Sequence, residues 1–353
     1  MSLKVPAWKV PRPLSPASAP WILPIRVSQV AGWEIAAILM LLAAGPGTLT
    51  ETGRIVAVSL AALVVVTTSI RFAGRHLAAW TFIGLTYRLR QHDDRHDAGD
   101  PLHALAGEVR LREHVDRAGN RFGVAETGSG WTAVLRMTAP VNPDPEILVE
   151  ALRDAYERTD IPLAGAQLVA WTMPRSDGGT PYRVHWLAVR YRPEEAPIAA
   201  LARGGGDLGA LRACACAALT VLGALAEAGY ECTVLDAAEL GEELALALGA
   251  ERDSAEITDG WRSWTAGGLA QSCFLPHDTG DLSRLLTAHA PGAAFTASSF
   301  ALRRTAAGKT REDVAIRVGT RTGLPAARPD VPAFPLHGRH ADHVRRSLPL
   351  ALP

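Results

Sequence analysis

The chain has 353 residues, of which 48% are hydrophobic and 20% charged, so it is long enough for one large or two modest domains. Its 36 basic and 36 acidic residues cancel, which excludes a strongly basic nucleic-acid binder and an acidic-tail protein. This balance conceals two unlike parts, because residues 1–90 carry a net charge of +7 and residues 91–353 carry −7. The four cysteines match neither a disulfide framework nor a zinc signature.

Two apolar runs dominate the N-terminal part. Residues 35–50 and residues 55–70 are each a stretch of 16 uncharged residues. A helix of that length spans about 24 Å, and apolar flanks extend both runs toward the ~30 Å hydrocarbon core of a bilayer. We therefore predict a transmembrane helical hairpin over residues 30–74. A buried hairpin of a soluble domain and a cleaved signal peptide fit less well, because neither run has a wide polar face and a proline-rich stretch precedes them.

The residues that flank the two runs suit the surfaces of a membrane. Arginine side chains can reach the headgroups, and tryptophan is enriched at the interface. Basic residues concentrate before the first run and after the second, so the positive-inside rule places both termini in the cytoplasm, at the inner (plasma) membrane. The basic end also predicts anionic lipid as a partner. The predicted membrane-flanking residues are Arg26, Trp33, Arg54, Arg71, Arg75 and Trp80.

Four further segments complete the predicted organisation. Residues 1–29 form a cytoplasmic N-terminus rich in proline and arginine, and residues 75–120 form a charged juxtamembrane linker. The histidines and aspartates of this linker could form a metal cluster, but such mixtures are common in exposed linkers, which is the favoured interpretation. Residues 121–320 form a cytoplasmic domain, and residues 321–353 form a flexible tail rich in proline, histidine and arginine.

The cytoplasmic domain alternates strand-like and helix-like patterns. A hairpin turns at Gly128–Gly130, and Asp144 followed by Pro145 predicts the start of a helix. The order has no repeated βαβ unit, so it predicts an α+β fold with a mixed or antiparallel sheet and three to four helices. Strands are predicted at 166–173, 184–192, 231–235, 294–304 and 313–320, a second hairpin at 261–274, and further helices at 207–228, 237–248 and 281–288.

No set of residues has the spacing of an active site. The glycines of Gly204–Gly209 match G-x-G-x-x-G, but eleven residues separate them from the preceding strand, and Asp207 would repel a phosphate. Cys214 and Cys216 point to opposite sides of a helix, so they cannot easily chelate an ion together. We therefore predict no catalytic, cofactor-binding or metal-binding residues.

The order of several motifs resembles a known family. They are Gly123–Val124, the Gly128-x-Gly130-Trp131 hairpin, His185–Pro197, the glycine turn Ala202–Gly206 and Leu235–Leu240. Together with the hairpin, they resemble EccE, a membrane component of the actinobacterial type VII (ESX) secretion system, over roughly residues 20–320. The resemblance implies a structural subunit of the protein secretion translocon that docks to other proteins, is not an enzyme and has no cofactor. It also implies a hetero-oligomeric complex with EccB-, EccC- and EccD-like proteins.

An alternative function is a membrane-tethered enzyme that acts on a lipid- or nucleotide-linked substrate. Its support is the glycine turn at Gly204–Gly209 and the scattered histidines of the linker and tail.

Overall fold

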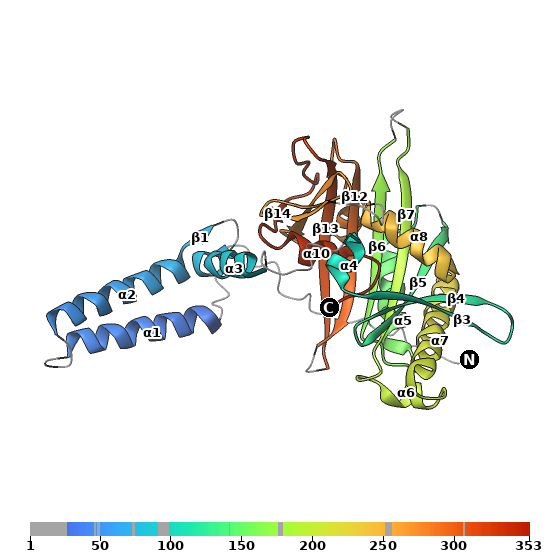
Figure 1. Ribbon diagram of the computed structural model, residues 1–353, viewed down its shortest axis with the longest axis horizontal. Coiled ribbons are helices and arrows are strands. Elements are labelled where there is room, and N and C mark those ends of the chain that lie inside the picture. The colour runs from blue at the N-terminus through green and yellow to red at the C-terminus, as the bar shows by residue number, and fades with distance from the viewer. Residues whose placement is uncertain are drawn as a thin grey trace, which may run out of the picture.

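The structure is a computed structural model, and it describes residues 27–45, 47, 50–72, 75–90, 99–140, 142–175, 179–250, 256–305 and 308–353. These residues form two parts, a helical hairpin and a sheet domain (Figure 1). The hairpin projects from one side of the sheet domain, and a third helix lies at its base, between the two parts.

Helices α1 (Val27–Ala44) and α2 (Glu51–Ser69) form the hairpin, and small residues lie where the two helices meet. Ala36 and Ala61 are 4% and 2% exposed. A Cβ atom added at Gly32 would lie 2.9 Å from the side chain of Thr68, so the start of α1 packs closely against the end of α2. Small residues at such a contact let two helix backbones approach each other, as in membrane helix pairs.

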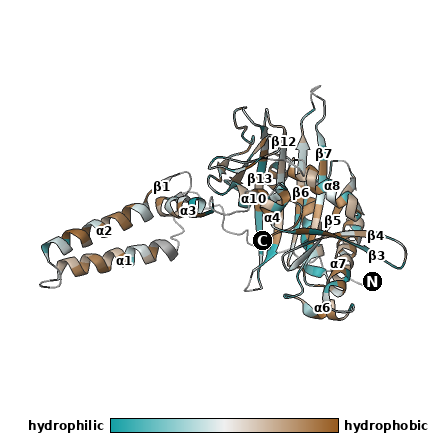
Figure 2. Ribbon diagram, viewed as in Figure 1, coloured by the Kyte–Doolittle hydropathy of each residue, from teal (hydrophilic) through white to brown (hydrophobic). Residues whose placement is uncertain are grey.

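Large apolar side chains cover the outside of this hairpin. Leu41 and Ile55 are 73% and 64% exposed. Figure 2 shows hydrophobic residues along both helices. A hairpin that folds in water would bury such side chains and turn its alanines outward. The arrangement is therefore typical of helices surrounded by lipid.

The segment predicted as a charged linker contains regular structure. Strands β1 (Arg71–Phe72) and β2 (Arg75–His76) form a small ladder, which leads into helix α3 (Leu77–Arg90). Helix α4 (Pro101–Ala106) and strand β3 (Val109–Val115) follow. This corrects the prediction of a linker over residues 75–120, because Ile83, Leu102 and Leu105 are buried and hold the segment to the sheet domain. The possible metal cluster at residues 92–97 lies outside the described residues.

A single 12-stranded sheet organises the rest of the chain. Its main path runs β3-β4-β5-β7-β6-β12-β13-β11-β10-β9, with β8 beside β5 and β14 beside β11, and every pairing is antiparallel. The β6–β12 pair joins the two halves of the sheet. The remaining strands are β4 (Arg121–Thr127), β5 (Gly130–Ala139), β6 (Gly165–Met173), β7 (Tyr182–Tyr191), β8 (Glu231–Val234), β9 (Ile257–Asp259), β10 (Trp264–Ala266), β11 (Leu269–Pro276), β12 (Phe295–Arg304), β13 (Thr310–Arg321) and β14 (Ala333–Pro335).

Helices cover both faces of the sheet, so two hydrophobic clusters form its core. One face carries α5 (Pro145–Arg158), α6 (Pro197–Leu201), α7 (Gly206–Glu227) and α9 (Leu282–Leu286). The other face carries α4, α8 (Ala237–Leu248) and α10 (His340–Ser347). The predicted α+β class and antiparallel sheet are confirmed. Between residues 121 and 320 the described residues contain five helices, and the short α6 is the one that was not predicted.

A core helix and a membrane helix can be equally apolar, and the extent to which the protein buries the helix distinguishes them. By length and composition, α2 and α7 are each apolar enough to cross a bilayer, while α1 is a shorter apolar helix. The apolar window of α7 is 50% buried, against 11% for α2. Helix α7 is therefore a core helix of the sheet domain, although its composition alone does not reveal this.

Local signals explain where the long helices begin and end. The Asp144 carboxylate accepts hydrogen bonds from the N–H groups of Glu146 and Ile147, at 2.9 and 3.3 Å, and thereby caps α5. Asp236 and Glu239 form a capping box at the start of α8. Gly249, with a φ of +72°, ends α8 in the left-handed conformation that glycine adopts readily. These boundaries agree with the predicted ones.

The last 33 residues are part of the fold, which corrects the prediction of a flexible tail over residues 321–353. Leu348, Leu350 and Leu352 are no more than 2% exposed. The side chain of Gln167 on β6 donates to the carbonyl of Arg346 and accepts from the N–H of Ala351, both at 2.8 Å. The high proline, histidine and arginine content of this segment suggested disorder, but its short apolar end at residues 348–352 completes one hydrophobic cluster.

Two glycines of α7 predict opposite effects of the same substitution. A Cβ atom at Gly209 would clash with the carbonyl oxygen of Ala200 on α6, whereas at Gly223 it would meet nothing within 4 Å. Gly209→Ala should destabilise the domain by about 1–3 kcal/mol, because the close packing of α6 on α7 must open. Gly223→Ala should stabilise it by about 0.5–1 kcal/mol through backbone entropy. Thermal unfolding of both variants in detergent measures this difference, and equal signs would contradict the packing assignment.

Candidate functional site

The glycine turn connects α6 to α7. Gly204, Gly205 and Gly206 have φ angles of +113°, +69° and +55°, which residues other than glycine rarely adopt. Arg212 donates from Nη1 to the carbonyl of Arg203 at 3.1 Å and braces the turn. The glycines therefore form a sharp connection between two helices.

Two of the cysteines, Cys214 and Cys273, and two of the tail histidines, His337 and His340, are packing residues. Burial raises the pKa of Cys214 and of Cys273 to about 12, so both thiols are protonated and unreactive at neutral pH. His340 lies on α10 with its Nδ1 accepting the N–H of Cys273 at 3.0 Å, and His337 stacks on Trp261. Among the residues that the structure describes, no group of three or more His, Cys, Asp or Glu side chains could hold a metal ion.

A cavity of about 650 Å³ lies beside β5, β7 and α8. Two of its charged groups, Glu243 and Arg136, are paired with each other. The carboxylate of Glu243 forms an ion pair with Arg136 and accepts a hydrogen bond from Trp186 Nε1 at 2.8 Å. Arg136 also donates to the Tyr182 hydroxyl at 3.1 Å. Burial lowers the pKa of His185, at the edge of this cavity, to about 4, so that imidazole is neutral at physiological pH.

The predicted membrane-flanking residues fall at both ends of the hairpin. Trp33 on α1 is 37% exposed, and its neighbour Gly32 packs against the end of α2. Arg71 and Arg75 follow that end in the β1–β2 ladder. Arg54 lies at the opposite end, where its Nη2 donates to the carbonyl of Gly45 at 3.2 Å. Arg26 lies outside the described residues. Trp80 is the exception, because it packs against the sheet domain.

A cluster of rings joins α3 to the sheet domain. The Trp80 ring lies 6.1 Å from the ring of Trp261, between centroids, and Tyr87 meets Trp261 edge-on at 5.3 Å. Ile83 is 5% exposed, and its Cγ2 would lie 3.0 Å from a Cβ atom placed at Gly338. Glycine at position 338 therefore lets α3 approach the C-terminal segment closely. We call this contact the joint.

The charged part of the joint is built around Arg90, the last residue of α3. Its Nε lies 3.2 Å from the carboxylate of Asp259 on β9, and its Nη1 lies 2.9 Å from that of Asp342 on α10. Its Nη2 also donates to the carbonyl of Gly338 at 2.6 Å. The Asp259 side chain is 1% exposed, whereas that of Asp342 is 40% exposed. A buried carboxylate requires a compensating charge, and Arg90 supplies it.

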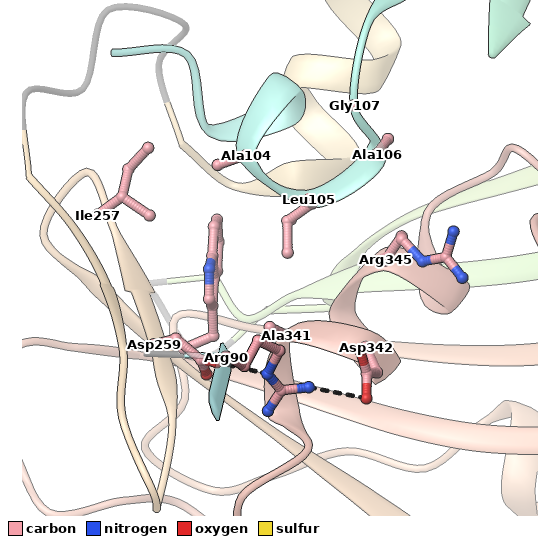
Figure 3. A pocket seen from close by; sticks show the side chains of 11 residues that line it. Arg90, Ala104, Leu105, Ala106, Gly107, Ile257, Asp259, Ala341, Asp342 and Arg345 are labelled. Atoms are coloured by element: carbon pink, nitrogen blue, oxygen red, sulfur yellow. Dashed lines mark ion pairs between the residues drawn. The ribbon is translucent and has the colours of Figure 1, made fainter. Parts of the chain in front are cut away.

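A pocket of about 340 Å³ lies next to the joint, between α3, α4, β9 and α10. Figure 3 shows Arg90 directed toward Asp259 and Asp342, with Leu105 of α4 facing them across the pocket. The Arg90 guanidinium in this pocket is held by two carboxylates and a carbonyl. The pocket is therefore suited to holding α3 in place rather than to transferring protons. The joint is the structure's candidate functional site, as it is where the hairpin meets the sheet domain.

The joint is not predicted from the sequence. The sequence patterns place Trp80 at a membrane surface and His337 and Asp342 in a flexible tail. The available signal was the spacing of Trp80, Ile83, Tyr87 and Arg90, which places all four on one helical face. That spacing identifies a contact face, but it does not identify the partner.

Because buried histidines of the sheet domain are neutral, we expect the folded protein to lose stability in acid. Burial, followed by the nearby His337 and Arg90, lowers the pKa of His340 from 6.5 to about 3. The unfolded chain therefore binds more protons between these values, so stability is lost as the pH falls through that window. Between about pH 7.5 and about pH 5 the loss should be about 2 kcal/mol from His340, and His185 adds to it in the same direction.

Unfolding of the full chain in detergent, followed by tryptophan fluorescence over this pH range, measures the loss. His340→Asn keeps an acceptor for the Cys273 N–H but cannot titrate, so its stability should depend less on pH. An unchanged pH dependence in this variant would contradict the role of His340.

A comparison with protein families supports the resemblance noted from the motifs. A family model described as "type VII ESX secretion system translocon, EccE" matches residues 180–275. The matched segment runs from β7 through α6, α7, β8 and α8 to β11. It contains three of the motifs that carried the resemblance. The comparison with curated proteins found no match.

Proposed function

We propose, on the family match at residues 180–275, that the chain is a member of the EccE family of type VII ESX secretion translocon components and that it is a structural, membrane-anchored subunit. In this proposal it works by docking to other proteins, without catalysis of its own. The family match is the observation that carries the proposal.

The hairpin supports anchoring in the inner membrane. Its small residues lie inside and its large apolar residues lie outside, an arrangement that lipid stabilises and water does not. Helix α2, with 19 residues, spans about 28 Å, close to the thickness of the hydrocarbon core. The apolar part of α1, Val30–Ala44, spans about 22 Å and needs its flanking residues to reach both surfaces. We assign residues 30–74 to the membrane, with Trp33, Arg54, Arg71 and Arg75 at its surfaces.

We further propose that both termini lie in the cytoplasm. Arg71, Arg75, Arg88 and Arg90 follow the second helix, whereas Arg54 stands alone in the turn. This distribution fits the positive-inside rule and favours contact of the basic end with anionic lipid. The sheet domain would then face the cytoplasm, where its unpaired cysteines stay reduced.

The proposed partners are EccB-, EccC- and EccD-like membrane components. The joint suits such a role because it fixes the sheet domain to the anchor through rings and a buried ion pair. A domain held in this way presents its surface to neighbours at a defined position above the bilayer. No catalytic step is needed for this function.

Purification from the native membrane in gentle detergent tests the proposal. The protein should comigrate with a megadalton-sized complex that contains an FtsK/SpoIIIE-like ATPase. A protein found only as a free monomer, with the complex intact in the same preparation, would contradict it. Turnover of a lipid- or nucleotide-linked substrate by the purified protein would instead support the membrane-tethered enzyme.

A further inference from the structure

Helix α3 has two apolar faces on opposite sides. Trp80, Ile83, Tyr87 and Arg90 lie within an arc of about 80° and form the joint. Phe82, Leu85 and Leu89 lie within an arc of about 60° on the other side of the helix. These three side chains are 67%, 57% and 67% exposed. A surface helix with one contact face normally carries polar residues on the other.

The second face begins where the hairpin ends. The N–H of Leu77, the first residue of α3, donates to the carbonyl of Ile70, which follows α2 directly, at 3.0 Å. The β1–β2 ladder occupies the short segment between the helices. Figure 1 shows α3 beside this ladder, at the base of the hairpin. The exposed apolar face is therefore held next to the end of a helix that we place in the membrane.

One positive charge beside this face, that of Arg88, suits an anionic lipid surface. Arg88 is exposed and lies beside Leu85 on the helical wheel. Apolar side chains flanked by arginine are the pattern of helices that lie in the interface of a membrane with anionic lipids.

We propose that α3 lies in the plane of the membrane surface and inserts Phe82, Leu85 and Leu89 between the lipids of the leaflet nearest the sheet domain. The opposite face of the helix holds the sheet domain through the joint, so α3 connects the domain to the lipid surface on one side and to the hairpin at its end. The domain is thereby held at a defined orientation to the bilayer. This inference rests on the proposed membrane anchor.

Lipid is a better candidate for this face than a protein partner, because the face lies directly next to the end of the proposed membrane helix α2. A face next to the end of a membrane helix meets the bilayer surface before any other subunit is present. A helix of a partner subunit on the same face is a competing occupant, and it predicts that the face stays in water when the protein is alone.

A fluorescent label can measure how deep the face lies. The full chain, with Cys216→Ser and Cys232→Ser, leaves two buried thiols of raised pKa, Cys214 and Cys273, which do not react. A single NBD label is then placed by Leu85→Cys. Two control positions are Leu63→Cys in α2 and Ile198→Cys on α6, where the native side chains are 57% and 79% exposed. Each protein is reconstituted into phosphatidylcholine–phosphatidylglycerol vesicles with lipid-borne nitroxide quenchers.

The label at Leu85→Cys should lose about half of its fluorescence to shallow quenchers, since an interfacial helix lies ~5–10 Å into the headgroup boundary. The label at Leu63→Cys should respond to deep quenchers, and that at Ile198→Cys to neither. Adding Phe82→Ser and Leu89→Ser should reduce the quenching at Leu85→Cys without changing the thermal midpoint, because these side chains are exposed.

Three outcomes would overturn the inference, and they are distinguishable. If Leu63→Cys is quenched but Leu85→Cys behaves like Ile198→Cys, the hairpin spans the membrane and α3 does not insert. If Leu85→Cys is unquenched alone but becomes shielded in the purified complex, the face binds a partner subunit. If Leu63→Cys is not quenched, the proposed anchor itself fails.

Discussion

Replacing Arg90 by methionine should open the joint and release α3 from the sheet domain. Methionine keeps much of the apolar stem but removes the charge that compensates the buried Asp259 carboxylate. Removing one partner of a buried ion pair costs about 3 kcal/mol, which corresponds to roughly 100-fold faster amide hydrogen exchange in a locally opening segment. Hydrogen exchange of α3 in the full chain, followed by mass spectrometry, measures this opening.

Asp342→Asn is the matched control, because Asp342 pairs with the same arginine at the surface. Its side chain is 40% exposed, so the loss should stay below about 1 kcal/mol. Combining Arg90→Met with Asp259→Asn should recover part of the stability, since the buried charge is then gone. Equal effects of Arg90→Met and Asp342→Asn would show that burial of Asp259 does not control the joint.

Arg317→Ala should be the most destabilising single substitution in the sheet. Arg317 on β13 is 0% exposed, donates from Nη1 to the side chain of Gln271 at 2.8 Å, and donates from Nη2 to the carbonyl of Ala247. Its guanidinium carbon lies 5.1 Å from the centre of the Phe295 ring. Truncation leaves a cavity and two acceptors without their donor, which should cost about 4 kcal/mol.

Two variants separate the contributions to this cost. Arg317→Met fills most of the cavity and should lose about half as much, because packing is restored while the hydrogen bonds are not. Arg311→Ala, on the same strand with a side chain that is 67% exposed, should change stability by less than about 0.5 kcal/mol. Denaturant unfolding of the full chain in detergent compares them, and a small effect of Arg317→Ala would contradict its structural role.

Elements with strong local signals could be predicted from sequence. The Asp144–Pro145 pair marks the start of α5, and Gly249 marks the end of α8. The apolar run of β7 indicates a strand covered on both faces, and the structure has helices on both sides of the sheet. Such signals act over a few residues, so the surrounding fold changes them little.

Elements whose order depends on distant contacts were missed. The C-terminal segment lacks periodicity, yet Leu350 and Leu352 complete a cluster formed by strands far away in the chain. Tyr87 donates a hydrogen bond to the carbonyl of Asp259, 172 residues later, and Arg90 donates one to the carbonyl of Gly338, 248 residues later. The sequence of α3 does not indicate which distant residues it contacts, so the joint could not be predicted.

Local patterns predict the apolar hairpin, the α+β domain and the motifs that resemble the EccE family, because periodicity, caps and motif order can be recognised over short stretches of the chain. Contacts between distant segments establish which residues of the C-terminal segment join the core and which face of α3 meets the sheet domain, and they confirm α7 as a core helix. Composition is nearly the same for α2 and α7, and only burial separates them. Burial is a property of the whole chain, since it depends on which distant surfaces are brought together.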